Sequence, residues 1–172
     1  MNYAAIKPWD IANGPGVRVS LFVSGCAHHC KDCFNAEAWD FNYGAPFDAQ
    51  EEEKLLALLT PDYIRGITYL GGEPFDPRNQ PALLDLTRKI RARYPQKTIW
   101  AFTGYVYDEN LPRVDGVTQE LLEGLDVLVD GPFIAARKNL SLRFRGSDNQ
   151  RLIDMPKTLQ TGAVVLWNDA QE

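Results

Sequence analysis

The residues of this sequence whose type and spacing most clearly indicate chemistry are three cysteines, Cys26, Cys30 and Cys33. They are the only cysteines in the chain and lie within eight consecutive positions. A disulfide framework would need an even number of cysteines spread along a small secreted chain. Soft thiolates instead select zinc, copper(I) or an iron–sulfur cluster. We therefore expect the three cysteines to bind a metal centre or to take part in redox chemistry.

Two kinds of metal centre fit three thiolates on this short stretch, the cysteine loop (residues 26–33). A structural zinc site needs four ligands, and His28 or His29 could supply the fourth. A four-iron cluster held by three thiolates leaves one iron without a protein ligand, and an open coordination position is typical of catalytic metal sites. The cysteine count favours the iron–sulfur cluster, with zinc as the alternative. A third alternative is that the three cysteines are buried and pack as small apolar side chains. The polar residues between them are not typical of a buried core segment.

A second candidate site is the tetrapeptide Gly71-Gly72-Glu73-Pro74, which follows the apolar run at 66–70. Two glycines let the backbone approach a ligand closely and adopt a positive φ, and the proline fixes the exit of the turn. The Glu73 carboxylate could accept a charge-assisted hydrogen bond from an ammonium group. Taken alone, the tetrapeptide would mostly be an ordinary tight turn, but its position at the strand after the cysteine loop favours a ligand-binding role.

Three further polar features lie at or after expected strand ends. Thr103 closes the run at 98–103, and Asp130 follows the run at 126–129. The stretch 145–151 (RGSDNQR) holds two arginines and two amides, which suit contacts with an adenine, a carboxylate or a partner. Each feature has a structural alternative: a simple strand end for Thr103, a helix cap for Asp130 and a polar turn for 145–151.

Apolar periodicity divides the chain into alternating strands and helices. Runs of β-branched and aromatic residues bounded by Gly or Pro predict strands. Leucines at helical spacing predict helices, and Asp48 is the expected N-cap of the first one. The expected strands are 17–24, 66–70, 98–103, 126–129 and a late strand at 163–167, and the expected helices are 48–59, 80–93 and 117–124.

Strand–helix–strand units with apolar strands predict parallel pairing through right-handed crossovers. The chain has too few units to close an eight-stranded barrel, which needs about 200 residues or more. We therefore predict an α/β fold, an open, partial parallel β/α barrel shortened relative to a full TIM barrel. Functional loops in such folds follow the carboxyl ends of the strands. The loops that begin at Gly25, Gly71, Gly104 and Asp130 carry the candidate residues.

Length and composition narrow the class of protein. A chain of 172 residues predicts a single domain, residues 1–172, with a core at about 9–154 and a C-terminal extension at 155–172. With 18 basic against 23 acidic side chains and no basic stripe, no nucleic-acid partner is expected. No apolar run approaches the roughly 18 residues of a membrane span, and residues 1–10 lack a secretion signal. We expect a cytoplasmic protein with no membrane partner.

The CxxxCxxC spacing after the first expected strand, followed by GGEP after the second, resembles the radical S-adenosylmethionine (SAM) enzymes. This resemblance implies that the three cysteines are the catalytic metal ligands and hold a 4Fe–4S cluster whose open iron binds SAM. It also implies that the residues beside SAM lie in the loops after the next three strands, and these are Gly71, Gly72, Glu73, Pro74, Thr103 and Asp130.

Several stretches resemble one family within that superfamily, the activating proteins of the anaerobic (class III) ribonucleotide reductase. The resemblance covers residues 9 to 154, and its stretches are 13–18 (NGPGVR), 24–30 (SGCAHHC), 100–105 (WAFTGY), 128–133 (LVDGPF) and 145–151 (RGSDNQR). Asn13 stands where the family pattern has aspartate. Lys31-Asp32 replaces proline–glycine, and Phe34 replaces tyrosine. These departures touch the rigidity of the cysteine loop rather than its three thiolates.

The family resemblance implies a function and its partners. An electron donor such as flavodoxin or ferredoxin would reduce the cluster, SAM would be cleaved, and the radical would abstract hydrogen from a glycine of the large reductase subunit. A short chain that leaves the barrel mouth open suits such a protein substrate, whereas small-molecule sites usually surround their ligand. The alternatives are an activase of another glycyl-radical enzyme, a compact radical SAM enzyme acting on a small molecule, and a non-catalytic zinc-binding interaction module.

Overall fold

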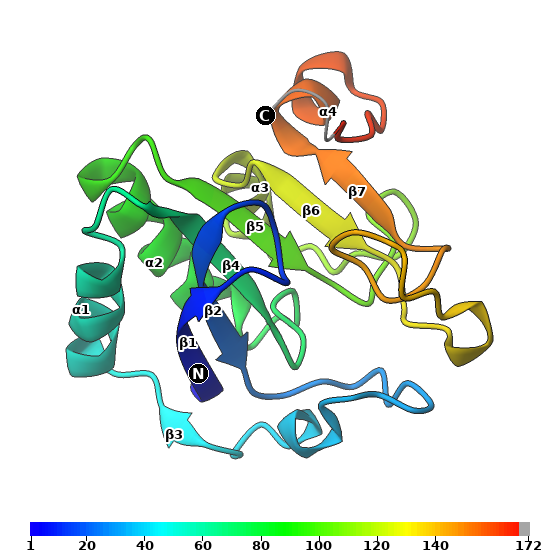
Figure 1. The fold of residues 1–172 in the computed structure, drawn as a ribbon, viewed down its shortest axis with the longest axis horizontal. Helices are drawn as coiled ribbons and strands as arrows, with labels where there is room; N and C mark the ends of the chain where they lie inside the picture. Colours follow the sequence, from blue (N-terminus) through cyan, green and yellow to red (C-terminus); the bar gives the residue numbers. More distant parts are fainter. Residues whose placement is uncertain (169–172) are drawn as a thin grey trace.

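A seven-stranded sheet forms the centre of the computed structural model, which describes residues 1–168 (Figure 1). Its strands follow the order β3-β1-β2-β4-β5-β6-β7. The strands are β1 (Asn2–Asp10), β2 (Val17–Val23), β3 (Ala45–Pro46), β4 (Ile64–Gly71), β5 (Thr98–Phe102), β6 (Val127–Asp130) and β7 (Arg151–Asp154). The helices are α1 (Ala49–Leu58), α2 (Gln80–Arg93), α3 (Thr118–Glu123) and α4 (Met155–Thr161), with 3₁₀ turns η1 (Ala36–Trp39) and η2 (Ala135–Arg137).

The four central strands, β2, β4, β5 and β6, pair in parallel, as the strand–helix pattern predicts. Their register places Val23 of β2 beside Gly71 of β4, and Phe102 of β5 beside Val129 of β6. β1 and β3 add antiparallel strands at one edge, and β7 adds one at the other. The sheet is therefore mixed and open. The α/β class is confirmed, and the antiparallel edges are an addition to the predicted fold.

Most expected elements are confirmed, and one is wrong. The four central strands and α1, α2 and α3 overlap their expected ranges, and Asp48 caps α1 by accepting a backbone hydrogen bond. The late strand expected at 163–167 does not form, because Leu166 makes only an isolated bridge, to Ile153. The strand at this edge is β7, whose four residues include just two apolar side chains. So short a run shows no strand pattern of its own.

β1 has no counterpart among the expected strands. Exposed and half-buried positions alternate only over residues 4–9, and the strand includes Pro8, which disfavours a central strand. The structure accommodates the proline at a register shift between Lys7 and Asp10. Pairing with the almost fully buried β2 therefore explains β1 better than its own composition does.

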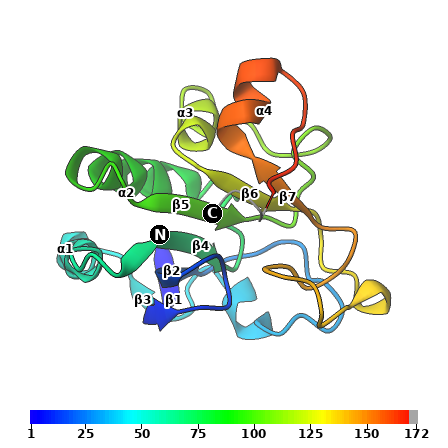
Figure 2. The same ribbon diagram turned by 45° about the horizontal axis from the view of Figure 1, so that its top comes forward.

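The two faces of the sheet pack against different partners. Along β5, Ile99 and Ala101 belong to the main core with side chains of α1, α2 and α3, whereas Trp100 belongs to a smaller cluster. The rings of Phe144 and Trp167 lie edge-on to Trp100, with centroids at 5.5 and 5.0 Å. Figure 2 shows α2 and α3 on one side of β5, with the cysteine loop and the segment after β6 on the other. Successive side chains of a strand point to opposite faces of the sheet. One face of the sheet therefore carries the main core, and the other carries the smaller aromatic cluster.

The helices cover the core and are short. α2, the longest, has 14 residues and buries Leu83, Leu86 and Ile90. It ends at Arg93, with Tyr94 as its C-cap, because Pro95 disfavours helical backbone at the residue before it. Within residues 1–168 no helix is long and apolar enough to cross a membrane.

Candidate functional site

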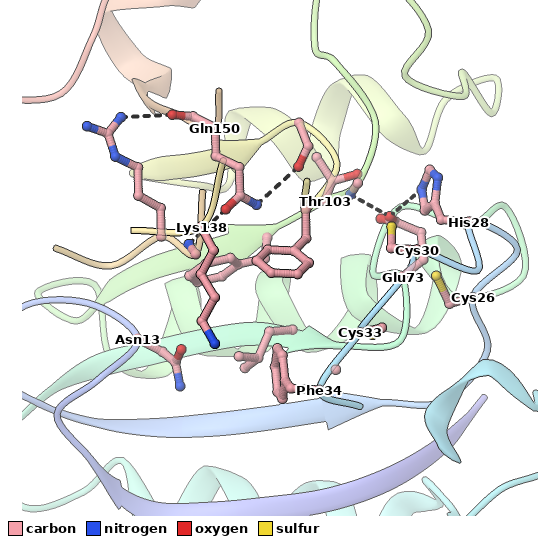
Figure 3. Close-up of a pocket in the computed structure, with 18 of the residues that line it drawn as sticks. Asn13, Cys26, His28, Cys30, Cys33, Phe34, Glu73, Thr103, Lys138 and Gln150 are labelled. Carbon is pink, nitrogen blue, oxygen red and sulfur yellow. Dashed lines mark hydrogen bonds and ion pairs between the residues drawn. The ribbon is translucent and has the colours of Figure 1, made fainter. Parts of the chain in front are cut away.

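A cavity of about 460 Å³ opens where the loops after β2, β4, β5 and β6 meet (Figure 3). The carboxyl ends of parallel strands lie at one edge of the sheet, so their loops converge there. A further wall comes from the segment 138–150, which leads into β7. The predicted site residues that line the cavity are Cys26, Cys30, Cys33, Gly71, Gly72, Glu73 and Thr103.

The cysteine loop leaves β2 through Gly25, whose φ of +94° favours glycine. A Cβ at this position would lie 2.0 Å from the Phe41 ring, so the turn requires glycine. Farther along the loop, His29 and Asp32 adopt left-handed backbone, with φ of 48° and 59°. These turns let three free, partly exposed thiols face one cavity from a single short loop.

Asp32 stands where the family pattern has glycine, and its positive φ explains that pattern. Left-handed backbone costs an L-residue about 1 kcal/mol, although Asp tolerates it better than most residues. Glycine also gains freedom in the unfolded chain, so we expect Asp32→Gly to raise the free energy of unfolding of the metal-free, reduced protein by about 0.5 kcal/mol. Urea denaturation would measure this change, with Asp32→Ala expected to be less stable than wild type. A glycine variant as unstable as the alanine variant would contradict the inference that the left-handed backbone strains Asp32.

Burial sets the protonation of two thiols. Removal from water raises the pKa of Cys26 to about 11, and it also raises the pKa of Cys30. A hydrogen bond from the His28 backbone N–H to Cys26 opposes this effect in part. Both thiols are therefore protonated at neutral pH in the metal-free protein, and metal binding must displace their protons.

Alkylation of the metal-free protein should reveal the raised pKa of Cys26. The thiolate is the reacting form, so a rise from the usual value near 9 to about 11 lowers the reactive fraction near pH 8. The expected loss of rate is on the order of 100-fold. Iodoacetamide pulses across about pH 7 to 11, followed by peptide mass spectrometry, would give the rate of each cysteine, with the urea-unfolded protein as control. A folded Cys26 that reacts at the unfolded rate would exclude burial as the cause.

Neither histidine of the cysteine loop is placed to complete a zinc site. His28 Nε2 lies 2.9 Å from the Glu73 carboxylate, and the His29 ring packs edge-on against Trp39 at 4.6 Å between centroids. Within residues 1–168, no three His, Cys, Asp or Glu side chains are grouped so that they could hold one metal ion. The donor set consists of three free thiols along one cavity wall, which fits a cluster of several irons.

The Gly71-Gly72 turn lies against the end of β2. Gly71 has a φ of +107°, and a Cβ there would lie 2.7 Å from the Phe22 Cα. A Cβ on Gly72 would lie 2.5 Å from the Gly25 carbonyl oxygen. The Gly72 N–H donates to the Val23 carbonyl at 2.7 Å. The close approach of this turn to the start of the cysteine loop therefore requires both glycines.

Glu73 is 1% exposed and joins three loops. Its Oε2 accepts hydrogen bonds from the Gly104 N–H at 2.8 Å and from His28 Nε2 at 2.9 Å (Figure 3). Its Oε1 accepts one from the Phe75 N–H at 2.8 Å. A carboxylate offers about four acceptor positions, so one is not used by these three hydrogen bonds. The sequence indicates a ligand-binding role for Glu73, and the structure adds an anchoring role that spacing alone does not reveal.

Among the remaining predicted residues, Thr103 lines the cavity, whereas Pro74 and Asp130 do not. Thr103 Oγ1 accepts the Tyr105 N–H at 3.1 Å, as a strand-end residue would. Asp130 is buried, and its Oδ1 accepts a hydrogen bond from Arg151 Nε at 3.0 Å. Contact of Pro74 or Asp130 with a ligand stays a prediction.

The segment 138–150 contributes cavity residues that the sequence pattern does not single out. Lys138 lines the cavity, and Figure 3 shows its side chain extending into it. Contact of the stretch 145–151 with a ligand or a partner stays a prediction. Arg145 and Gln150 line the cavity, while Gln150 Oε1 accepts two backbone N–H groups of the same stretch. No local signal marks Lys138, because only the folding of this long segment brings it to the site.

Known proteins match this chain along most of its length. A sequence profile described as a 4Fe-4S single cluster domain matches residues 12–153. The chain is 43% identical over 152 residues to a protein of Escherichia coli (strain K12), covering 87% of this chain and 96% of that protein. It is 41% identical over 154 residues to a protein of Enterobacteria phage T4, covering 88% of this chain and 93% of that protein. Both relatives are named anaerobic ribonucleoside-triphosphate reductase-activating protein.

A third relative bearing that name, from Vibrio cholerae serotype O1, is 42% identical over 152 residues and covers 87% of this chain and 96% of that protein. The profile match includes the cysteine loop, the Gly71-Gly72 turn and the segment 138–150, so the similarity extends to the walls of the cavity. The family resemblance read from the motifs is confirmed. The chain belongs to the family of anaerobic ribonucleoside-triphosphate reductase-activating proteins and carries a 4Fe–4S single cluster domain.

Proposed function

We propose that this chain is a radical SAM activase, which cleaves SAM reductively at a 4Fe–4S cluster and generates a glycyl radical on the anaerobic ribonucleoside-triphosphate reductase. One observation carries the proposal. Three free thiols lie on one wall of a 460 Å³ cavity that also holds the Gly71-Gly72 turn and Glu73. The names of the relatives support the target, because each names activation of that reductase.

Cys26, Cys30 and Cys33 would hold the cluster, and three thiolates leave one of its four irons without a protein ligand. When bound, the cluster and SAM together supply one-electron reduction and hydrogen-atom abstraction. The chain's own contribution is to fix the three thiols on one wall through the turns at Gly25 and His29. Partial burial of the thiols also limits the access of water to this wall.

The proposed SAM-binding residues are Gly71, Gly72, Glu73, Pro74, Thr103 and Asp130. Glu73 would accept the methionine ammonium at the acceptor position that its three internal hydrogen bonds leave free. Gly71 and Gly72 would let backbone approach the ligand, and Thr103 offers a hydroxyl at the wall. Pro74 would fix the exit of the turn, and Asp130, at the end of β6, is the last residue proposed to lie near SAM.

Apolar side chains cover much of the remaining wall. Leu70, Phe102, Phe133 and Phe144 line the cavity. An apolar, water-poor site prevents side reactions of a reactive species. These side chains would therefore protect the radical chemistry from quenching by solvent.

The proposal extends to the fold, the partners and the compartment. We infer one radical SAM domain over residues 1–172, with a core at about 9–154, an extension at 155–172 and the sheet as a shortened barrel. Its support is that loops after four parallel strands carry the cavity. The large reductase subunit is the protein substrate, and a flavodoxin or ferredoxin is the electron donor, without nucleic acid or membrane. Three free thiols fit the reducing cytoplasm.

Anaerobic product analysis tests this function. After reconstitution with iron and sulfide, we expect the protein to hold roughly four irons per chain. Addition of dithionite and SAM should then release methionine and 5′-deoxyadenosine in equal amounts, with an unreduced sample as control. A colourless protein that holds one zinc and does not bind SAM would contradict the proposal and favour a zinc-binding interaction module.

A further inference from the structure

We propose that the His28 side chain is a positioning residue, which fixes the middle of the cysteine loop to Glu73 and Gly104. This inference rests on the proposed function and assigns a role to a side chain that the cluster and SAM assignments leave unused. The contact would hold the three thiols at a set position relative to the carboxylate that receives the ligand ammonium.

The hydrogen bond between His28 and Glu73 has a defined direction. Glu73 Oε2 accepts the Gly104 N–H at 2.8 Å, so this oxygen acts as an acceptor. A carboxylate only accepts hydrogen bonds, so His28 Nε2, at 2.9 Å from the same oxygen, is assigned as the donor. The His28 side chain is 20% exposed and that of Glu73 is 1% exposed, so water competes little for this bond. Hydrogen bonds to ionised acceptors are stronger than neutral ones.

Packing holds the His28 ring on two further sides. A Cβ on Gly104 would lie 2.6 Å from His28 Cδ2, so the imidazole occupies the space that a side chain would need. The Tyr105 ring lies edge-on to the imidazole, at 4.3 Å between centroids and an angle of 63°. Gly104 and Tyr105, in the loop after β5, therefore pack against the His28 ring and restrict its position.

The rest of the cysteine loop is held in other ways. At its start, the Cys26 N–H donates to the Trp39 carbonyl at 3.1 Å. At its end, the Cys33 N–H donates to the Cys30 carbonyl at 3.2 Å, which is a bond within the loop. In the middle, His28 forms a partly buried hydrogen bond to Glu73, which also binds the loop after β5. Loss of this bond would free the middle of the loop to move relative to Glu73.

Three variants separate hydrogen bonding from packing. His28→Gln keeps an N–H donor for Glu73, and His28→Phe keeps a ring against Gly104 and Tyr105 but cannot donate. Ala27→Ser, at an exposed position beside His28, is the neighbouring control. Loss of a partner behind metal ligands costs about 10–100-fold in affinity or activity. For His28→Phe we expect the Kd for SAM to rise about 10-fold and iron loss to a chelator to become about 10-fold faster. His28→Gln and Ala27→Ser should stay within about 3-fold of wild type.

Amide hydrogen exchange in the metal-free, reduced protein tests the contact without cluster or SAM. In His28→Phe, we expect exchange in peptides covering 26–33 and 102–107 to be about 10-fold faster, because local opening becomes easier. His28→Gln should restore the wild-type rate. If wild type binds neither iron nor SAM, the proposed function fails, and this measurement still decides the role of His28.

Gly104→Ala supplies an independent variant. Its methyl group would displace the His28 ring, so it should weaken SAM binding and speed iron loss as His28→Phe does. Combined with His28→Ala, it should add little, because residues in contact are not additive. Wild-type exchange and iron retention in His28→Phe would overturn the inference, as would a glutamine variant as impaired as the phenylalanine one. Fully additive losses in the double variant would overturn it too.

Discussion

Replacement of Cys30 by serine is expected to abolish SAM cleavage while the fold stays intact. Cys30 is a free, partly exposed thiol on the cavity wall, so serine fits in its place without strain. A hydroxyl is a hard, weakly acidic donor and does not replace a soft thiolate at iron. Loss of partners behind metal ligands already costs about 10–100-fold, so loss of a ligand should lower the rate of SAM cleavage by at least about 1,000-fold.

The release of 5′-deoxyadenosine by reconstituted protein would measure this effect. Ala27→Ser is the matched control, because it introduces the same side chain at an exposed position of the same loop. The control should keep wild-type iron content and activity. Full SAM cleavage by Cys30→Ser would count decisively against the cysteine loop as the cluster site.

Glu73→Gln is expected to weaken SAM binding by about 10–100-fold, because hydrogen bonds to charged groups contribute about 1.5–3 kcal/mol. The amide has nearly the shape of the carboxylate but no charge for a ligand ammonium. It also turns one of the two oxygens that accept from Gly104, His28 and Phe75 into a donor. Both changes act in the same direction, on the ligand and on the loops around it.

Anaerobic equilibrium dialysis of SAM with reconstituted protein would measure the dissociation constant. Glu109→Gln, at an exposed position, is the control for loss of one carboxylate. Thermal unfolding followed by circular dichroism would show whether the variant keeps its fold. A folded Glu73→Gln variant with wild-type SAM affinity would remove Glu73 from the ligand-binding set.

The sequence predicts the central part of the fold because each element there carries its own signal. Five of the eight residues at 17–24 are apolar, and the helix at 80–93 shows leucines at helical spacing. The edges lack such signals. β1 contains Pro8, and the four residues of β7 hold two apolar side chains, so pairing with buried neighbours decides both strands. The late apolar run at 163–167 shows the converse, since hydrophobicity without a full pairing partner made no strand.

Some residues of the candidate site likewise carry a local sequence signal, whereas others are placed only by the overall fold. The cysteine loop and the Gly71-Gly72 turn are local motifs, and parallel topology brings them to one edge of the sheet. Lys138 is different, because it reaches the cavity only through the folding of a long segment before β7. Asp130 shows a third case. It occupies the expected strand end, but its side chain pairs with Arg151, a contact that nothing in the local sequence indicates.

The most direct test of the central claim is electron paramagnetic resonance on anaerobic, reconstituted protein. The sample would contain reductant, SAM and the large subunit of the anaerobic ribonucleoside-triphosphate reductase. We predict a glycyl-radical doublet on the reductase, with release of methionine and 5′-deoxyadenosine. Those products without a doublet would retain SAM cleavage and reject this partner. An intact four-iron cluster that yields neither products nor doublet would contradict the account.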